Sequence, residues 1–263
     1  MVKNSLRVVV LAYLAMLLVI PVSIVVYHAF NAGIGPVIDA LTTPAALHAF
    51  QITAVVTFYA VLANTVFGVV TALLLVRYRF PGKRILNALI DLPLAVSPVI
   101  VGLALVLVYG RTTGTGRALA DVGINIIFSI PGMVIATVFV CIPLVVRAVA
   151  PVLEEIGDEQ EQAAATLGAG GWQTFRRITL PAIRGALAYG VVLALARSLG
   201  EYGAIAVVSG RLVGRTQTVT LFVQERYQNF DQRAAYASAV VLVVTAIVAL
   251  LISRALRPKE LVR

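Results

Sequence analysis

Long apolar runs dominate this chain, and each is long enough to form a helix that crosses a membrane. A helix rises 1.5 Å per residue, so about 20 residues cross a hydrocarbon core of roughly 30 Å. The pattern predicts an all-α integral membrane protein with six transmembrane helices in a single domain, residues 1–263. The expected spans are residues 8–27, 52–76, 85–109, 126–146, 186–208 and 236–252.

The first run follows Lys3 and Arg7 and therefore shares one feature with secretory signal peptides. It is longer than the apolar part of a signal peptide, and no small-residue cleavage site follows it cleanly. We expect it to be a retained transmembrane helix.

Composition agrees with a membrane protein and argues against a nucleic-acid-binding one. The 263 residues are 60% hydrophobic and 13% charged, with a mean hydropathy of +0.96, whereas soluble domains carry about 25% charged residues. The net charge of +9 comes mostly from cations at the ends of apolar runs, not from one basic face.

The distribution of Lys and Arg predicts which side each segment faces. With six spans, 14 of the 21 cations fall on the side of both termini, 6 fall on the opposite side, and Arg197 lies inside a span. Cytoplasmic loops carry the excess of Lys and Arg. We therefore expect a multi-pass protein of the plasma (inner) membrane, with both termini and the segment 154–182 in the cytoplasm.

One polar, glycine-broken insert, EQAAATLGAGGWQTFRRITLP at residues 161–181, interrupts the apolar pattern. Unpaired backbone groups are costly in hydrocarbon, so the insert is expected outside the bilayer. Asp158 and Glu161 form a capping-box pattern that predicts a short helix ending at Gly168. A second helix is expected to begin near Gly171.

Two interpretations of this helical hairpin follow from the residues alone. The small alanines would allow another protein's backbone to approach closely. Alternatively, the hairpin lies on lipid headgroups, with Trp172 and Arg176 as anchors.

The insert resembles the EAA loop of ABC-importer permeases. That pattern is E-A-A, three residues, G, nine residues, I, one residue, L-P. Gln162 departs from it, because the pattern has Glu there and this chain has Glu161 one place earlier, which puts any ion pair of that Glu in doubt. The matching residues, at the required spacings, are Ala163, Ala164, Gly168, Ile178, Leu180 and Pro181.

The resemblance implies a type I (MetI-like) permease whose loop forms a coupling helix on a cytosolic ABC ATPase dimer. The sequence contains no G-x-x-x-x-G-K-[ST] motif, so P-loop binding of ATP is not expected in this chain. By the resemblance, ATP and Mg²⁺ are bound by the partner ATPase. No cofactor is expected in this chain, and the chain is not expected to be an enzyme.

Two further stretches, IDLPLAVSPVIVGL (90–103) and ARSLGEYGAIAVVSG (196–210), resemble the oxyanion branch of these permeases. The wider likeness is to the CysW-type subunits of sulfate/thiosulfate importers, which implies a homologous second permease subunit in a heterodimer and an extracytoplasmic sulfate-binding protein. The alternatives are a molybdate or tungstate permease and, more remotely, a stand-alone secondary anion transporter.

Arg197 and Glu201 are the charges of most interest inside a span. Their separation by four positions predicts one helix face. They are either a buried structural ion pair or a pair that lines the pathway, lending positive potential to an anion when Glu201 turns away. Asp91 is interpreted as a cap for a helix kinked at Pro93, and Asn64 as a hydrogen-bonding contact between helices.

No catalytic or metal site is expected. His28 and His48 lack metal-ligand spacing, and Ser198 and Ser209 lack the partners of a catalytic triad. Cys141 lies in an apolar run and is interpreted as a small buried residue.

Overall fold

The computed structural model describes residues 2–256, and the regular structure of that part is helical throughout. Residues 1 and 257–263, which include the C-terminus expected in the cytoplasm, lie outside the described residues. The elements are α1 (Val2–Phe30), α2 (Ile34–Leu41), α3 (Pro44–Arg77), α4 (Lys83–Ala95), α5 (Pro98–Tyr109), α6 (Gly114–Asp121), α7 (Ile130–Ile156), α8 (Glu159–Thr166), α9 (Gly171–Thr174), the π-helical turn η1 (Phe175–Thr179), α10 (Leu180–Leu199), α11 (Ile205–Val208), α12 (Val219–Gln228) and α13 (Gln232–Leu256).

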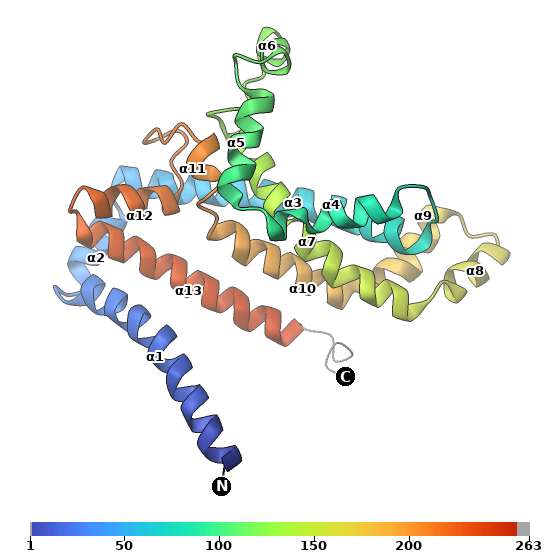
Figure 1. The fold of residues 1–263 in the computed structure, drawn as a ribbon, viewed down its shortest axis with the longest axis horizontal. Helices are drawn as coiled ribbons and strands as arrows, with labels where there is room; N and C mark the ends of the chain where they lie inside the picture. Colours follow the sequence, from blue (N-terminus) through green and yellow to red (C-terminus); the bar gives the residue numbers. More distant parts are fainter. Residues whose placement is uncertain (1, 257–263) are drawn as a thin grey trace.

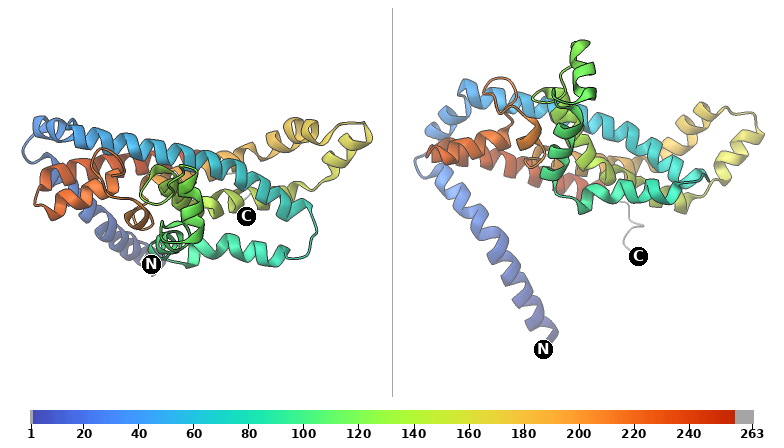
Figure 2. Two further views of the ribbon diagram at one scale, coloured as in Figure 1. Left: turned by 90° about the horizontal axis from the view of Figure 1, so that it is seen from above. Right: turned by 45° about the horizontal axis from the view of Figure 1, so that its top comes forward.

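The long helices α3, α7, α10 and α13 run side by side and form the body of the molecule (Figures 1 and 2). The helices α8 and α9 project from one end, which we call the insert end. At the other end lie α2 and α12. Two parts leave the body: α1 extends away from it, and α5 with α6 projects from its side. From Val9 to Phe30, nearly all apolar side chains of α1 are exposed, as expected for a surface that faces lipid or another subunit.

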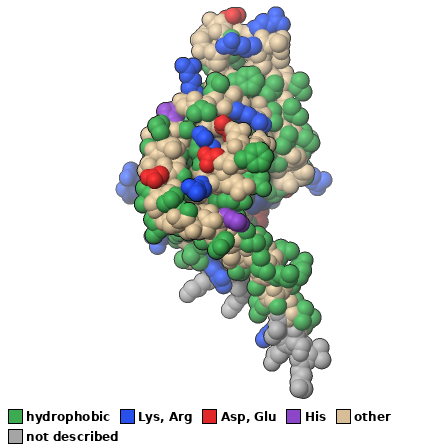
Figure 3. All heavy atoms as spheres, turned by 90° about the vertical axis from the view of Figure 1, so that its left-hand side faces the viewer, with side chains coloured by type: hydrophobic (Ala, Val, Ile, Leu, Met, Phe, Trp, Pro, Cys, Tyr) green, Lys and Arg blue, Asp and Glu red, His purple; other side chains and the backbone are tan. Residues whose placement is uncertain are grey.

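The end opposite the insert is polar. Figure 3 shows acidic and basic side chains gathered there, while α1 below them is largely hydrophobic. Arg226 pairs with Asp231 across 3.4 Å, and the amide of Gln217 bonds to the carboxylate of Glu225. Such a polar surface fits a position in water at the far end of the spans.

Glycines allow α7 to pack closely between α3 and α10. A Cβ added at Gly68 of α3 would lie 2.7 Å from Cβ of Val145, and one added at Gly190 of α10 would lie 2.9 Å from Cβ of Ala148. Small residues at helix contacts let the backbones approach closely. In a membrane, the resulting van der Waals packing stabilises helix association, because the hydrophobic effect does not act between helices there. Val145 and Val149 are fully buried in this core.

The predicted span 85–109 is not one helix. Its residues form α4 and α5, which meet at an angle of 115° after a break at Val96 and Ser97. Pro98 stands at the start of α5, where its missing N–H and fixed φ are tolerated. Five helices of the described part are long and apolar enough to cross a membrane, or six if the bent pair counts as one span.

The span expected at 126–146 is shifted along the chain. Helix α7 begins at Ile130 and continues to Ile156, so Arg147 lies inside the helix instead of flanking it. Its guanidinium bonds to both carboxylate oxygens of Asp91 on α4, at 2.8 and 2.6 Å. The interpretation of Asp91 as a helix cap is therefore wrong, because this carboxylate joins two helices.

The span expected at 186–208 also ends early. Helix α10 stops at Leu199, and the chain turns at Gly200 before the single helical turn of α11. Gly200 and Gly203 bracket this turn, and the chain is apolar again from Ala204 to Val208, so hydropathy averaged over the whole run gave no sign of the break. The other predicted spans, 8–27, 52–76 and 236–252, lie within α1, α3 and α13.

Candidate functional site

The polar insert forms the predicted short helix and ends where expected. Helix α8 stops at Thr166, and Gly168 has a φ of +81°. The N–H of Ala169 donates to the carbonyl of Ala164 at 3.0 Å, which closes the end of the helix. Glycine adopts this left-handed backbone without the strain that a Cβ brings.

The capping box predicted at the start of α8 does not form. Asp158 occupies the N-cap position, but its side chain makes no capping hydrogen bond. The carboxylate of Glu161 points to Arg77 and Thr179 instead of back to the backbone of Asp158. A charged partner and a hydroxyl compete successfully with the single backbone N–H that a capping box would supply.

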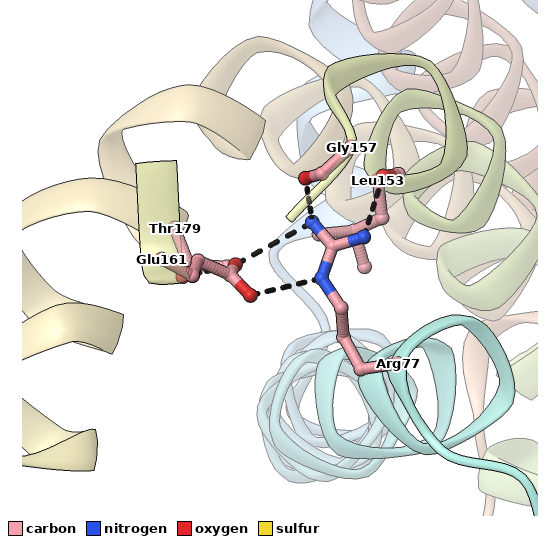
Figure 4. Close-up of polar contacts among 5 residues, drawn as sticks. All are labelled: Arg77, Leu153, Gly157, Glu161 and Thr179. Carbon is pink, nitrogen blue, oxygen red and sulfur yellow. Dashed lines mark hydrogen bonds and ion pairs between the residues drawn. The ribbon is translucent and has the colours of Figure 1, made fainter. Parts of the chain in front are cut away.

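Arg77, the last residue of α3, ties the insert to the membrane helices (Figure 4). Its Nε donates to Oε2 of Glu161 at 2.9 Å, its Nη1 to the carbonyl of Leu153 at 2.9 Å, and its Nη2 to the carbonyl of Gly157 at 2.6 Å. The side chains of Arg77 and Glu161 are only 14% and 22% exposed. The planar guanidinium presents several donors in fixed directions, so one residue holds three partners at once.

The partners of Arg77 belong to different parts of the fold. Leu153 lies in the last turn of α7, whose terminal carbonyls have no partner within the helix, and a cation there is favourable. Oε1 of Glu161 accepts a 2.7 Å hydrogen bond from the hydroxyl of Thr179, at the end of η1. Through this cluster, α3, α7 and the start of α10 are joined to the short helix α8.

A shallow hollow of about 360 Å³ lies between the end of α8 and the segment formed by α9 and η1. Three residues of the EAA pattern, Ala164, Gly168 and Ile178, line it. Beside them Leu167 and Trp172 are highly exposed. Gln173, Thr174 and Arg177 also line the hollow. The surface therefore combines exposed apolar side chains with polar ones, as suits contact with another protein.

The remaining residues of the pattern lie at either end of this surface. Gln162 and Ala163 are exposed on α8, while Leu180 and Pro181 form the first turn of α10. The ring of Trp172 stacks on that of Phe175 at 5.6 Å, so the indole is held by the insert itself.

Arg197 and Glu201 do form an ion pair, with 3.2 Å between Nη2 and Oε2. The prediction that both lie on one helix face is wrong, because α10 ends at Leu199 and Glu201 follows the break. The two side chains differ in environment: that of Arg197 is 45% exposed and that of Glu201 is 1% exposed. Oε1 of Glu201 accepts a hydrogen bond from the N–H of Ala204 at 2.9 Å.

The other singled-out residues have no apparent chemistry. Asn64 is fully buried and its amide makes no hydrogen bond within the described part of the chain, so the interhelical hydrogen bond predicted for it is not formed there. Cys141 is buried beside Ser198. His28 stacks on Tyr236. Among residues 2–256, no group of His, Cys, Asp and Glu could hold a metal ion.

Arg77 is the residue that sequence reasoning missed. It was counted only as one of the cations that set the orientation, and 84 positions separate it from Glu161. One signal was available: Glu161 stands one position before the place where the family pattern has its Glu, which singles out this acid.

Comparison with known proteins places the chain among transport proteins. The family model described as "Binding-protein-dependent transport system inner membrane component" matches residues 64–260. The sulfate transport system permease protein CysW of Synechocystis sp. is 46% identical over 258 residues, which cover 98% of this chain and 94% of that protein. The sulfate transport system permease protein CysT of Escherichia coli (strain K12) is 38% identical over 240 residues, 91% of this chain and 87% of that protein.

The fold has a counterpart of known structure. A chain from the crystal structure of a bacterial ABC transporter involved in the import of the acidic polysaccharide alginate matches with a TM-score of 0.78 at 17% identity, over 97% of this chain and 93% of that chain. This likeness confirms the predicted permease fold.

Proposed function

The chain belongs to the family of binding-protein-dependent transport system inner membrane components, and from that premise we propose that it is a permease subunit of an ATP-driven importer of sulfate or thiosulfate. The CysW and CysT proteins similar to it, at 46% and 38% identity, are named as sulfate transport system permease proteins. The stand-alone secondary transporter is thereby set aside, since the family acts together with a binding protein.

The single observation that supports coupling to an ATPase is the exposed surface of the insert, which the bonds of Arg77 hold to the membrane helices. The hollow around Gly168, with Leu167 and Trp172 exposed beside it, is the proposed docking site of a cytosolic ABC ATPase dimer. Arg77 would carry displacement of that surface into α3 and α7. Because the sequence has no P-loop motif, ATP and Mg²⁺ would be held by the ATPase.

The proposed cycle needs three partners. A sulfate-binding protein delivers the anion outside, a homologous T-type permease completes a heterodimer, and the ATPase dimer closes on ATP inside. ATP favours the outward-open state if it binds that assembly better than the inward-open one. In this arrangement the insert and both termini face the cytoplasm of the inner membrane.

Reconstitution tests the proposal directly. The chain is coexpressed with its T-type partner and the ATPase, purified, and placed in liposomes with labelled sulfate and the binding protein outside. We expect ATP-dependent uptake that unlabelled thiosulfate suppresses and equimolar molybdate leaves intact. Stronger suppression by molybdate than by thiosulfate would assign the importer to molybdate, and absence of ATPase from the purified complex would refute the coupling role.

A further inference from the structure

Arg197 is a cation in an otherwise apolar part of a membrane helix. It lies in the last turn of α10, within the candidate span Gly171–Leu199, and its side chain is 45% exposed. A guanidinium facing hydrocarbon is costly, so charged residues inside spans face a bundle interior or a water-filled path and mark functional sites. The exposed half of Arg197 therefore does not belong against lipid.

The depth of Arg197 can be estimated along α7. The Sγ of Cys141 lies 3.4 Å from the hydroxyl of Ser198, the neighbour of Arg197. Cys141 precedes Leu153, the level of the Arg77 cluster, by twelve residues, or about 18 Å of helix. Along α7, Arg197 thus lies about 18 Å from the level of the Arg77 cluster, well away from the insert and within the length of the membrane helices.

Glu201 is buried and held by hydrogen bonds, whereas the side chain of Arg197 is half-exposed. One carboxylate oxygen of Glu201 accepts the N–H of Ala204, and its backbone carbonyl accepts the hydroxyl of Thr220 at 3.0 Å. Rotating this buried side chain outward would strand an N–H at the start of α11. Nη2 of Arg197 lies 3.2 Å from Oε2 of Glu201 as an ion pair, and the remaining N–H groups of the half-exposed guanidinium can donate to another partner.

A second helix break lies against the first. A Cβ added at Gly203 would lie 3.1 Å from Cβ of Pro98, and one added at Gly102 would lie 2.9 Å from the carbonyl oxygen of Ala204. The start of α5 thus packs on the turn that follows α10. A break in a membrane helix is tolerated where the backbone is covered by protein or lines a cavity. In transporters, the N-terminus of a helix that begins at such a break often faces an anionic substrate.

We propose that Arg197 is a transient contact for the doubly charged oxyanion as it passes between the permease subunits, an inference that rests on the proposed function. The guanidinium matches the oxygens of a tetrahedral anion. Glu201 keeps the site weak by neutralising part of the charge. A transport site must bind strongly enough to admit its ion and weakly enough to release it, and a half-exposed cation paired with a buried acid meets both demands.

The test uses the complete transporter in liposomes, with sulfate-loaded binding protein on one side and ATP on the insert side. Three variants are compared with the wild type: Arg197→Gln, Arg197→Lys and, as a matched control, Arg254→Gln in the last turn of α13. The quantity measured is labelled sulfate transported per ATP hydrolysed. A residue with a purely structural role would change the amount of active complex and leave this ratio unchanged.

We expect Arg197→Gln to assemble and to hydrolyse ATP in response to the binding protein, while its sulfate-to-ATP ratio falls at least tenfold. Arg197→Lys should keep a ratio within about threefold of the wild type, and Arg254→Gln should match it. A wild-type ratio for Arg197→Gln would overturn the inference, as would loss of assembly in both Arg197 variants. Absence of sulfate uptake by the wild type, despite ATPase binding, would refute the proposed substrate as well.

Discussion

The guanidinium of Arg77 and the carboxylate of Glu161 meet at 2.9 Å across 84 positions of sequence, where the end of α3 touches the short helix α8. The same guanidinium bonds to the carbonyls of Leu153 and Gly157. The insert is therefore anchored to the membrane helices by the hydrogen bonds of one arginine. These bonds connect α8 directly to α3 and to the end of α7.

The first prediction concerns Arg77→Gln. Breaking a buried ion pair by removing one partner costs about 3 kcal/mol or more, because the remaining charge is left uncompensated. We expect the variant to reach the membrane but to bind the ATPase at least tenfold more weakly, with faster hydrogen exchange over residues 158–168. Pull-down of the ATPase and exchange mass spectrometry measure the two effects.

The exchanged pair, Arg77→Glu with Glu161→Arg, is the informative companion. It restores opposite charges but leaves the carbonyls of Leu153 and Gly157 without their donor, so we expect it not to recover ATPase binding. Full recovery would mean that only the charge pair matters. Wild-type ATPase binding by Arg77→Gln would show that Arg77 does not support the docking surface.

Local sequence patterns were informative where one or two residues determine the backbone conformation. The end of α8 at Gly168 was predictable because a left-handed turn needs glycine. The break after Leu199 was not predicted, because mean hydropathy over 186–208 stays high although Gly200 and Gly203 lie within that run, and a mean does not register single glycines. The bonds of Arg77 and Asp91 depend on how distant helices meet, which the sequence pattern does not encode.

The second prediction separates the two contacts of Glu201. Glu201→Gln keeps an oxygen that can accept the N–H of Ala204, whereas Glu201→Leu leaves that buried donor unpaired at a cost of about 1–3 kcal/mol. We expect the Leu variant to lower the melting temperature of the detergent-solubilised protein clearly more than the Gln variant does. If both variants lower it equally, the ion pair with Arg197 is the dominant contact, and the hydrogen bond to Ala204 adds nothing measurable.

The third prediction concerns orientation. Gln173 is exposed on the insert, and Cys141, the single cysteine of the sequence, is fully buried. A membrane-impermeant thiol reagent should therefore give little background. We expect Gln173→Cys to resist labelling from outside intact cells and to label after permeabilisation, while Phe230→Cys at the opposite end labels from outside. Labelling of Gln173→Cys in intact cells would invert the proposed orientation.

The fourth prediction uses two nearby glycines as a matched pair. Gly168 has a φ of +81°, and a residue with a Cβ there is strained by about 1 kcal/mol, or roughly fivefold in an equilibrium. Gly170 has a φ of −72° and, like Gly168, open space around its Cα, so Gly170→Ala carries no such strain. The two positions differ in backbone conformation while sharing the same loop.

We expect Gly168→Asp to enter the membrane at normal abundance, to bind the ATPase at least fivefold more weakly and to lose uptake of labelled sulfate. Gly170→Ala should behave as the wild type in both assays. The direction follows from the backbone: an aspartate at Gly168 shifts the exit of α8 and places a charge beside the small residues of the hollow, where a close partner would have to desolvate it. Wild-type ATPase recovery and uptake in Gly168→Asp would show that this turn does not couple the permease to its motor.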